Sequence, residues 1–283
     1  MVKSIISHRK FEYKIIQWEI LDFCNYDCFY CGLHNNSRFC TNYKDVVDYL
    51  NKNIPTSIFP TIPQLFGGEP TIHPEFWNIV ERFKVPFGIY TNLSKPIEFW
   101  KNLISFKNIH HIYCSCHYNS IKDKDEFEKK ISFLSDELKE KLTLNIMLES
   151  TDKYLFDLFD SFKDRCICVV TKIPNSNINL EIKEQYIHDR QCFDIKDGNE
   201  TKTYSSFQYD ELNEINTFNF KCSTINFFNN IDIDGNITNY CRKFKITDIY
   251  HDEYKKIDKK FIICKSRDFC PKYCYVIGRK EKI

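Results

Sequence analysis

The chain has 283 residues, of which 42% are hydrophobic, so it is long enough for one large domain or for a barrel with a small appendage. Its formal net charge is +1, which argues against a nucleic-acid partner or a membrane surface as its target. No signal peptide and no apolar run of membrane-spanning length is present, so we expect a cytoplasmic protein whose 14 cysteines stay reduced and serve metals or catalysis.

The first predicted strand covers residues 13–22 and runs into a cysteine-rich loop. In this loop Cys24, Cys28 and Cys31 follow the spacing Cys-x3-Cys-x2-Cys. Structural zinc sites usually take four ligands, and iron–sulfur cubes are usually held by four cysteines. Three thiolates can therefore hold three irons of a cube and leave the fourth iron open to another ligand. The alternatives are a zinc site completed by a distant residue and thiols that bind nothing.

Strands and helices alternate along the next part of the chain. The segments 59–66, 86–90, 110–116, 142–149 and 166–173 are predicted strands, and 43–51, 74–83, a segment from about 96, 123–141 and 154–162 are predicted helices. This alternation predicts an α/β fold with a parallel sheet covered by helices. Six strand–helix units are fewer than the eight of a closed barrel, so we expect an open, partial (β/α)6 TIM-like barrel.

Polar motifs follow the predicted strands at their carboxyl ends, where parallel sheets carry their sites. Glycines at a strand end let a ligand approach the backbone closely, and a carboxylate beside them can accept hydrogen bonds from an ammonium group. The alternatives are an ordinary turn and polar residues that only cap their strands. The motifs are Gly67-Gly68-Glu69-Pro70, Thr91-Asn92, Ser115 with His117, and Glu149.

The cysteine spacing, with the aromatic Tyr30 before the third cysteine, and the Gly-Gly-Glu-Pro motif resemble the radical S-adenosylmethionine (radical SAM) superfamily. The resemblance implies that Cys24, Cys28 and Cys31 hold a [4Fe–4S] cluster whose open iron chelates the amino and carboxylate groups of S-adenosylmethionine. One electron, from a flavodoxin- or ferredoxin-type donor, then cleaves the cofactor to a 5′-deoxyadenosyl radical. This radical abstracts a hydrogen atom from the substrate.

The resemblance also assigns residues to the cofactor, but no catalytic side chain. It implies that Glu69 and the nearby backbone hold the methionine amino group and that Tyr30 packs near the adenine. Thr91 and Asn92 resemble the Thr-Asn-Gly motif of the family, in which Leu93 here replaces the glycine. The residues expected to contact the cofactor are Tyr30, Gly67, Gly68, Glu69, Pro70, Thr91, Asn92, Ser115, His117 and Glu149.

A second group of cysteines follows a polar segment, 174–215, that we expect to be an irregular bridge. Residues 227–232 and 237–240 flank Asp234-Gly235-Asn236 and predict a hairpin. The cysteines around it resemble the auxiliary-cluster domains called SPASM and twitch, which implies one auxiliary [4Fe–4S] cluster. Five thiols compete for four positions, and a zinc knuckle is the alternative. The five are Cys222, Cys241, Cys264, Cys270 and Cys274.

The predicted organisation is an N-terminal extension at 1–12, a radical SAM core at 13–180, a bridging region at 181–215 and a SPASM- or twitch-like domain at 216–283. The other thiols lie mostly on predicted strands and are expected to be small apolar core residues. They are Cys40, Cys114, Cys116, Cys166, Cys168 and Cys192.

The resemblance leaves two substrate classes open. One is a small sugar- or nucleoside-like metabolite that is oxidised or rearranged, and the other is a ribosomally made peptide that is crosslinked or epimerised. Only 23 residues precede Cys24, too few for a leader-binding domain, so we expect a small molecule or a peptide delivered by a separate protein. An alternative function of another class is a zinc-containing binding module, built on a barrel that no longer carries out catalysis.

The metal content of the anaerobically purified protein tests the second cluster. About eight irons per chain indicate two cubes, whereas about four irons with one zinc indicate a C-terminal zinc knuckle. The double substitution Cys270→Ala with Cys274→Ala should remove about half of the iron and sulfide. The variant should still form 5′-deoxyadenosine slowly, because the open iron belongs to the other cluster, while product formation stops. An unchanged iron content in this variant contradicts the auxiliary cluster.

Overall fold

The computed structural model describes residues 2–7, 13–31, 37–57, 60–149, 153–173, 192–197, 199–205, 220–222, 228–239, 245–251, 262–263 and 279–282. The chain divides into two compact units. The barrel unit comprises residues 18–47 and 63–187, and the second unit comprises residues 1–17, 48–62 and 188–283.

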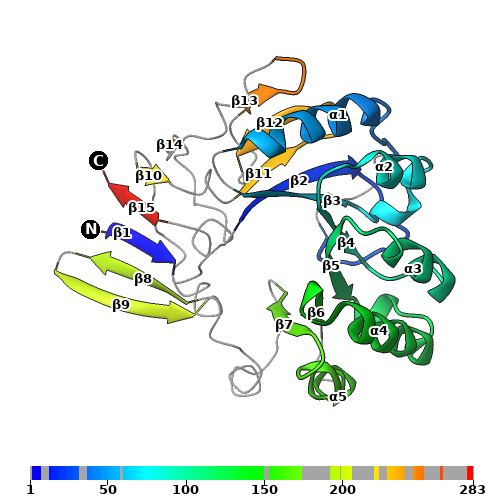
Figure 1. Ribbon diagram of the computed structural model, residues 1–283. Coiled ribbons are helices and arrows are strands. Elements are labelled where there is room, and N and C mark those ends of the chain that lie inside the picture. Colours follow the sequence, from blue (N-terminus) through cyan, green and yellow to red (C-terminus); the bar gives the residue numbers. More distant parts are fainter. Residues whose placement is uncertain are drawn as a thin grey trace. The chain divides into compact units, whose positions relative to one another are not determined.

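Six strands of one nine-stranded sheet lie side by side in the order of the sequence and build the barrel (Figure 1). The neighbouring strands from β3 to β7 are parallel. The predicted partial (β/α)6 barrel is therefore confirmed. The strands are β2 (Lys14–Leu21), β3 (Thr61–Gly67), β4 (Phe87–Thr91), β5 (Ile109–Cys116), β6 (Leu142–Leu148) and β7 (Ile167–Lys172).

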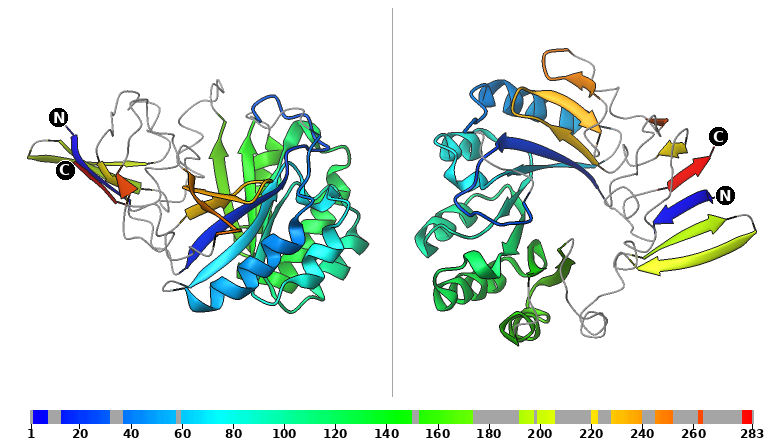
Figure 2. Two further views of the ribbon diagram at one scale, coloured as in Figure 1. Left: turned by 90° about the horizontal axis from the view of Figure 1, so that it is seen from above. Right: turned by 180° about the vertical axis from the view of Figure 1, so that it is seen from behind.

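Helices connect consecutive strands, and α2 to α5 lie along one side of the sheet (Figure 2). No described helix is both long enough and apolar enough to cross a membrane. The α-helices are α1 (Tyr43–Asn53), α2 (Phe76–Arg82), α3 (Ile97–Ile104), α4 (Lys124–Leu138) and α5 (Lys153–Phe162). Short 3-10 turns are η1 (Ile54–Thr56), η2 (Pro70–Ile72), η3 (Tyr118–Ser120) and η4 (Lys139–Lys141).

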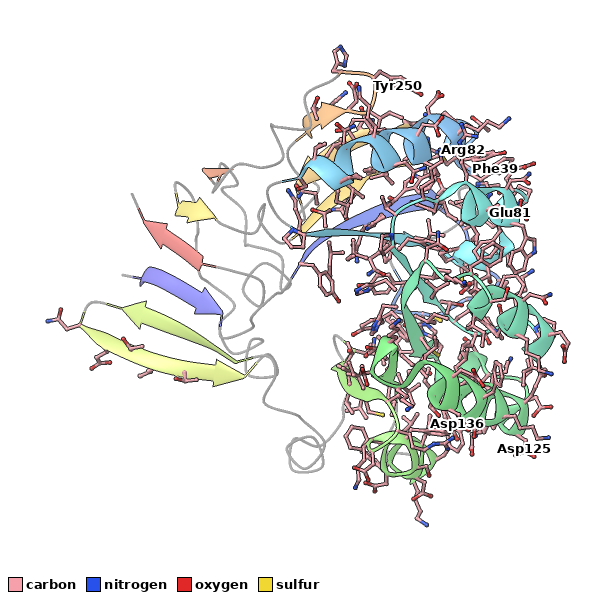
Figure 3. The ribbon with its side chains drawn as sticks, viewed as in Figure 1. Phe39, Glu81, Arg82, Asp125, Asp136 and Tyr250 are labelled. Atoms are coloured by element: carbon pink, nitrogen blue, oxygen red, sulfur yellow. The ribbon has the colours of Figure 1, made fainter. Side chains whose placement is uncertain are left out.

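Helix α4 shows how the sequence builds these elements. Asp123 caps its start by accepting a hydrogen bond from the N–H of Glu126 at 2.9 Å. Phe127, Ile131 and Leu134 recur at helical spacing, and all three are buried. The charged side chain of Asp136 lies on the solvent side of the helix (Figure 3). The helix therefore buries one apolar face, as its periodicity predicts.

The strands of the barrel unit present two different faces. On β4, the ring of Phe87 stacks on the ring of Phe83, which directly follows α2. Phe87 and every second residue after it on β4 therefore face the helices. The register continues this set on β5 through Ile112 and Cys114, which are fully buried. The residues of β5 that alternate with these two are half-buried and mostly polar, and they face the inside of the partial barrel.

Five of the predicted core cysteines are buried, as predicted, and the side chain of the sixth, Cys192, lies outside the described part of the chain. None of the five buried thiols is part of a disulfide. The five are Cys40, Cys114, Cys116, Cys166 and Cys168.

A six-stranded sheet with the order β14-β10-β15-β1-β8-β9 organises the second unit. The expectation of an irregular segment at 174–215 is wrong in part, because this segment contains β8 and β9, which pair antiparallel over six residue pairs. Strand β8 also pairs with β1, which lies in the predicted N-terminal extension. The strands are β1 (Val2–Ser7), β8 (Cys192–Asp197), β9 (Glu200–Ser205), β10 (Phe220–Cys222), β14 (Ile262–Ile263) and β15 (Arg279–Lys282).

The predicted hairpin is present in the second unit. Strands β11 (Phe228–Ile231) and β12 (Asn236–Asn239) pair antiparallel, and β12 pairs with β13 (Lys245–Asp248). Gly235 adopts a φ of 84°, which glycine tolerates better than other residues. Asp232 stabilises the turn by accepting hydrogen bonds from the N–H groups of Asp234 and Asn236 at 3.0 and 2.8 Å.

Candidate functional site

Three thiols lie on the loop that follows β2, at the carboxyl end of the first barrel strand. Cys28 is buried, and Cys24 and Cys31 are half-buried. Among the described residues, no three metal-ligating side chains meet at a point where a single ion could bind. A four-iron cluster binds each thiolate through a different iron, so its ligands need not converge on one point. Three thiols on one loop therefore fit a cluster better than a single ion.

Burial keeps two of these thiols protonated in the metal-free chain. It raises the pKa of Cys24 to about 11, although the N–H of Tyr26, 3.4 Å from Sγ, favours the thiolate. Burial also raises the pKa of Cys28, against a hydrogen bond with Ser120. Because metals bind the thiolate, cluster assembly has to release these protons.

The end of β3 packs directly against the backbone of the cysteine loop. The N–H of Gly68 donates to the carbonyl of Leu21, and the N–H of Glu69 donates to the carbonyl of Phe23, each at 3.1 Å. A Cβ atom on Gly68 would lie 1.7 Å from the carbonyl oxygen of Phe23. Gly67 has a φ of 136° and would meet Leu21 in the same way. The two glycines thus allow the loop itself, and not only a ligand, to approach closely.

Glu69 is completely buried at this strand end, and Pro70 beside it opens η2. Its Oε1 accepts hydrogen bonds from the N–H and hydroxyl of Thr71 at 3.1 and 2.6 Å and from the hydroxyl of Thr91 at 2.9 Å. Its Oε2 accepts one from the N–H of Asn92 at 2.6 Å. Burial raises the pKa of Glu69, and these hydrogen bonds oppose that shift. Oε2 retains a lone pair for a further donor.

The turn after β4 links Glu69 to the thiols. The side-chain amide of Asn92 donates to Asn25 at 2.9 Å and to the sulfur of Cys24 at 3.6 Å. Leu93 has a φ of 57°, which lies in the left-handed region of the backbone. Its carbonyl accepts a hydrogen bond from the buried amino group of Lys130 at 2.7 Å. This contact helps to offset the backbone strain of about 1–3 kcal/mol that such a conformation carries.

Three of the predicted cofactor residues contact one another. The hydroxyl of Tyr30 donates to Oε1 of Glu149 at 2.5 Å and lies 2.6 Å from Nδ1 of His117. The rings of Tyr30 and His117 stack with centroids 6.0 Å apart. Burial lowers the pKa of His117 to about 4, so this imidazole is neutral at pH 7. The ends of β2, β5 and β6 therefore meet at Tyr30.

The inside of the partial barrel carries a row of polar groups that the sequence reasoning did not identify. Nε2 of His111 lies 2.8 Å from the hydroxyl of Thr143. The hydroxyl of Thr171 donates to Oδ1 of Asn145 at 2.6 Å. Burial lowers the pKa of His111 to about 4, so it too is neutral. Ser115 pairs with Asn145 in the register of β5 and β6 and is half-buried beside this row.

Aromatic rings continue the inner face across β3, β4 and β5. The ring of Tyr90 lies 5.6 Å from that of Phe66 and 4.8 Å from that of Tyr113. Gly88 leaves space on the same face, and the amide of Gln64 lies over it. Oε1 of Gln64 is buried, and no described residue forms a hydrogen bond with it. A buried acceptor of this kind favours a ligand or water that can donate to it.

The predicted ligands of the auxiliary cluster fall mainly outside the described residues. Cys222 is the last residue of β10, and its side chain is not among the described ones. The auxiliary cluster therefore stays a prediction from sequence. The ligands outside the described residues are Cys241, Cys264, Cys270 and Cys274.

No protein-family model matches the chain, and no curated protein matches it. Among solved structures, Streptococcus suis SuiB bound to the precursor peptide SuiA shares 15% identity at a TM-score of 0.58, covering 88% of this chain and 65% of SuiB. The protein anSMEcpe with bound AdoMet and Cp18Cys peptide shares 14% identity at a TM-score of 0.56, covering 86% of this chain and 79% of anSMEcpe. SuiB is also known bound to S-adenosylmethionine. The chain thus spans about two thirds of the length of SuiB and shares the fold of both proteins.

The contact between Gly68 and the cysteine loop predicts a large cost for the substitution Gly68→Ala. The new Cβ meets backbone atoms that cannot move without displacing the loop. We expect a loss of about 3 kcal/mol or more in the free energy of unfolding, measured by urea denaturation. The matched control is Gly88→Ala, whose Cβ meets only the end of the flexible Gln64 side chain, so about 1 kcal/mol is expected. Equal costs for the two variants would show that the loop does not depend on this close approach.

Proposed function

Because the chain has the fold of radical SAM enzymes, we propose that it binds S-adenosylmethionine beside a [4Fe–4S] cluster held by Cys24, Cys28 and Cys31. The observation that carries this proposal is the loop of three thiols at the carboxyl edge of the sheet, anchored to the ends of β3 and β4. Together the cluster and S-adenosylmethionine supply a one-electron reductive cleavage that yields a 5′-deoxyadenosyl radical for hydrogen abstraction. A flavodoxin- or ferredoxin-type protein is the proposed electron donor.

In this proposal Glu69 receives the ammonium group of the cofactor's methionine moiety. A fully buried carboxylate has lost its hydration, and a cation is the partner that compensates this best. Among the described residues, three hydrogen-bond donors contact Oε1, whereas one, the N–H of Asn92, contacts Oε2. We therefore assign the ammonium contact to Oε2. Asn92 then connects this oxygen to Cys24, so cofactor and cluster positions are linked.

The inner face of the partial barrel supports an uncharged, hydroxyl-bearing substrate, such as a sugar-like metabolite. The polar groups described above on β3 to β7 of this face, among them His111 and the amide of Gln64, are neutral, and the rings of Tyr90 and Tyr113 can pack against C–H groups of a sugar ring. None of these groups offers the positive charge that a phosphorylated substrate requires. Oxidation or rearrangement of such a small molecule is the proposed reaction.

A ribosomally made peptide is the second candidate substrate. SuiB was solved with the precursor peptide SuiA, and anSMEcpe was solved with the Cp18Cys peptide. The hydroxyl and amide side chains of the inner face also suit the polar groups of a peptide backbone. Transfer of deuterium from labelled candidates into 5′-deoxyadenosine distinguishes the two classes, because only the true substrate gives up its hydrogen atom to the cofactor.

We also propose that four of the five C-terminal cysteines hold an auxiliary [4Fe–4S] cluster, as in SPASM and twitch domains. The support for this is the arrangement of cysteines around the hairpin of β11 and β12, which is present as the sequence predicts. A second cluster of this kind can ligate the substrate or accept the electron that remains after hydrogen abstraction.

The triple substitution of Cys24, Cys28 and Cys31 by Ala tests the proposed function. The variant should fold, since small residues replace thiols on a loop, but it should not cleave S-adenosylmethionine reductively. The measurement is the yield of 5′-deoxyadenosine with dithionite as reductant, against the wild-type chain reconstituted in the same way. A yield equal to that of the wild type would overturn the assignment of the cluster to this loop.

The substitution Glu69→Gln tests the ammonium contact. It removes the negative charge at nearly constant volume, so the affinity for S-adenosylmethionine should fall about 10- to 100-fold while the cluster is retained. Calorimetric titration and iron analysis measure the two quantities. Glu81→Gln, on the solvent side of α2 (Figure 3), removes an equal charge away from the site and should leave the affinity unchanged. Equal affinities in the two variants would show that Glu69 stabilises the turn but does not bind the ammonium group.

A further inference from the structure

Tyr30 is the centre of a hydrogen-bonded group that the proposed chemistry leaves without a role. It lies between Cys28 and Cys31 in the sequence. Contacts that hold its side chain in place therefore also restrain the backbone of both cysteines. Its hydroxyl reaches Glu149 after β6 at 2.5 Å and His117 after β5 at 2.6 Å. Both distances are typical of strong O–H···O and N–H···O hydrogen bonds.

The phenol of Tyr30 lies among Glu149, His117 and the thiol of Cys28, with which it also forms a hydrogen bond that favours the thiolate and so opposes the burial that raises the pKa of Cys28. The phenol hydroxyl donates a hydrogen bond to Oε1 of Glu149, so the phenol oxygen can accept a hydrogen bond from the neutral His117 in the tautomer that carries the proton on Nδ1. Oε2 of Glu149 accepts the backbone N–H of Asn119 at 2.8 Å. Both carboxylate oxygens therefore have a partner within the protein. A contact between Glu149 and the cofactor would have to compete with these hydrogen bonds.

The two halves of the cysteine loop are held by different contacts. The first half, around Cys24, is held by the end of β3 and by the amide of Asn92. The second half is held by the hydroxyl of Tyr30 and by the contact of Cys28 with Ser120 at 3.6 Å. The contact with Ser120 involves sulfur and is the weaker of the two. Tyr30 is thus the stronger of the described hydrogen-bonded links from the second half to the sheet.

We propose that Glu149 and His117 are positioning residues, which hold Cys28 and Cys31 in place through the phenol of Tyr30. This inference rests on the proposed function for its purpose, because a loop fixed in advance lowers the entropic cost of assembling the cluster and binding the cofactor. It differs from the expectation that the side chains of Tyr30, His117 and Glu149 each contact the cofactor directly. The hydrogen bonds within the group occur in a chain that carries no cofactor.

A double-mutant cycle with Tyr30→Phe and Glu149→Gln tests the proposal in the iron-free, full-length chain. The measurement is the rate at which iodoacetamide alkylates each cysteine, followed by mass spectrometry. Each single substitution should raise the rates at Cys28 and Cys31 about 10-fold, since a hydrogen bond to a charged group is lost. The double variant should react no faster than Tyr30→Phe alone, because this substitution already removes the hydroxyl through which residue 149 reaches the loop. Cys24, which is held by other contacts, should keep its rate.

Two controls separate positioning from a general loss of stability, and one replacement variant keeps the cycle feasible. Cys114 is fully buried on β5, so its alkylation reports unfolding of the barrel and should stay slow. Tyr118→Phe removes a neighbouring phenol that bonds Lys124 at 2.7 Å, and should change no rate at the loop. Where Glu149→Gln does not yield folded protein, His117→Phe takes its place in the cycle, because it keeps the stacked ring and removes Nδ1.

Several outcomes would overturn the proposal. Unchanged rates at Cys28 and Cys31 in the single variants would show that the loop does not need this link. Multiplying effects in the double variant would show that the two residues act independently, and parallel acceleration at Cys114 would assign the group to overall stability. The cycle uses no cofactor, so a chain that fails to form 5′-deoxyadenosine but shows the predicted coupling would refute the proposed function alone. After reconstitution, the affinity for S-adenosylmethionine should fall non-additively in the same cycle.

Discussion

The approach of β3 to the backbone after β2 is the constraint on which the site depends. A Cβ on Gly68 would lie 1.7 Å from the carbonyl of Phe23, so only glycine allows the two hydrogen bonds that join the strand end to the loop. This contact holds the cysteine loop at the edge of the sheet, and it joins the backbone of Glu69 to the start of the loop. Asn92 then extends the same network from Glu69 to Cys24. One packing arrangement therefore positions both the proposed cluster ligands and the proposed cofactor contact.

Charge and burial are the grounds for proposing a cationic cofactor group at this edge and a neutral substrate inside the barrel. Glu69 is completely buried, and four hydrogen bonds compensate only part of the cost of removing a carboxylate from water. A bound ammonium would supply the remaining compensation. Further inside the barrel, burial keeps His111 neutral, and its partner Thr143 carries no charge. The strand edge around Glu69 therefore favours a positively charged group, and the inside of the barrel around His111 favours a neutral one.

Periodicity and strand-end motifs predicted the parallel part of the fold, because each strand and its helix carry their own hydrophobic pattern. The sequence did not predict β1, β8 and β9, since β1 pairs with β8 and β15, which are both distant in the sequence, and β9 is rich in polar residues. Motif positions identified Glu69 and Tyr30, but their hydrogen-bond partners depend on tertiary contacts. The alternation of His111, Tyr113 and Ser115 on β5 was the available signal for the polar inner face.

The coordination of S-adenosylmethionine at the open iron is the central claim, and one measurement addresses it directly. The anaerobically reconstituted chain is reduced, mixed with S-adenosylmethionine that carries ¹⁵N in its methionine amino group, and studied by electron–nuclear double resonance. A hyperfine coupling between the cluster and this nitrogen is predicted, and it should disappear when Cys24, Cys28 and Cys31 are replaced. A reduced cluster in the wild-type chain that shows no coupling at saturating S-adenosylmethionine would contradict the account.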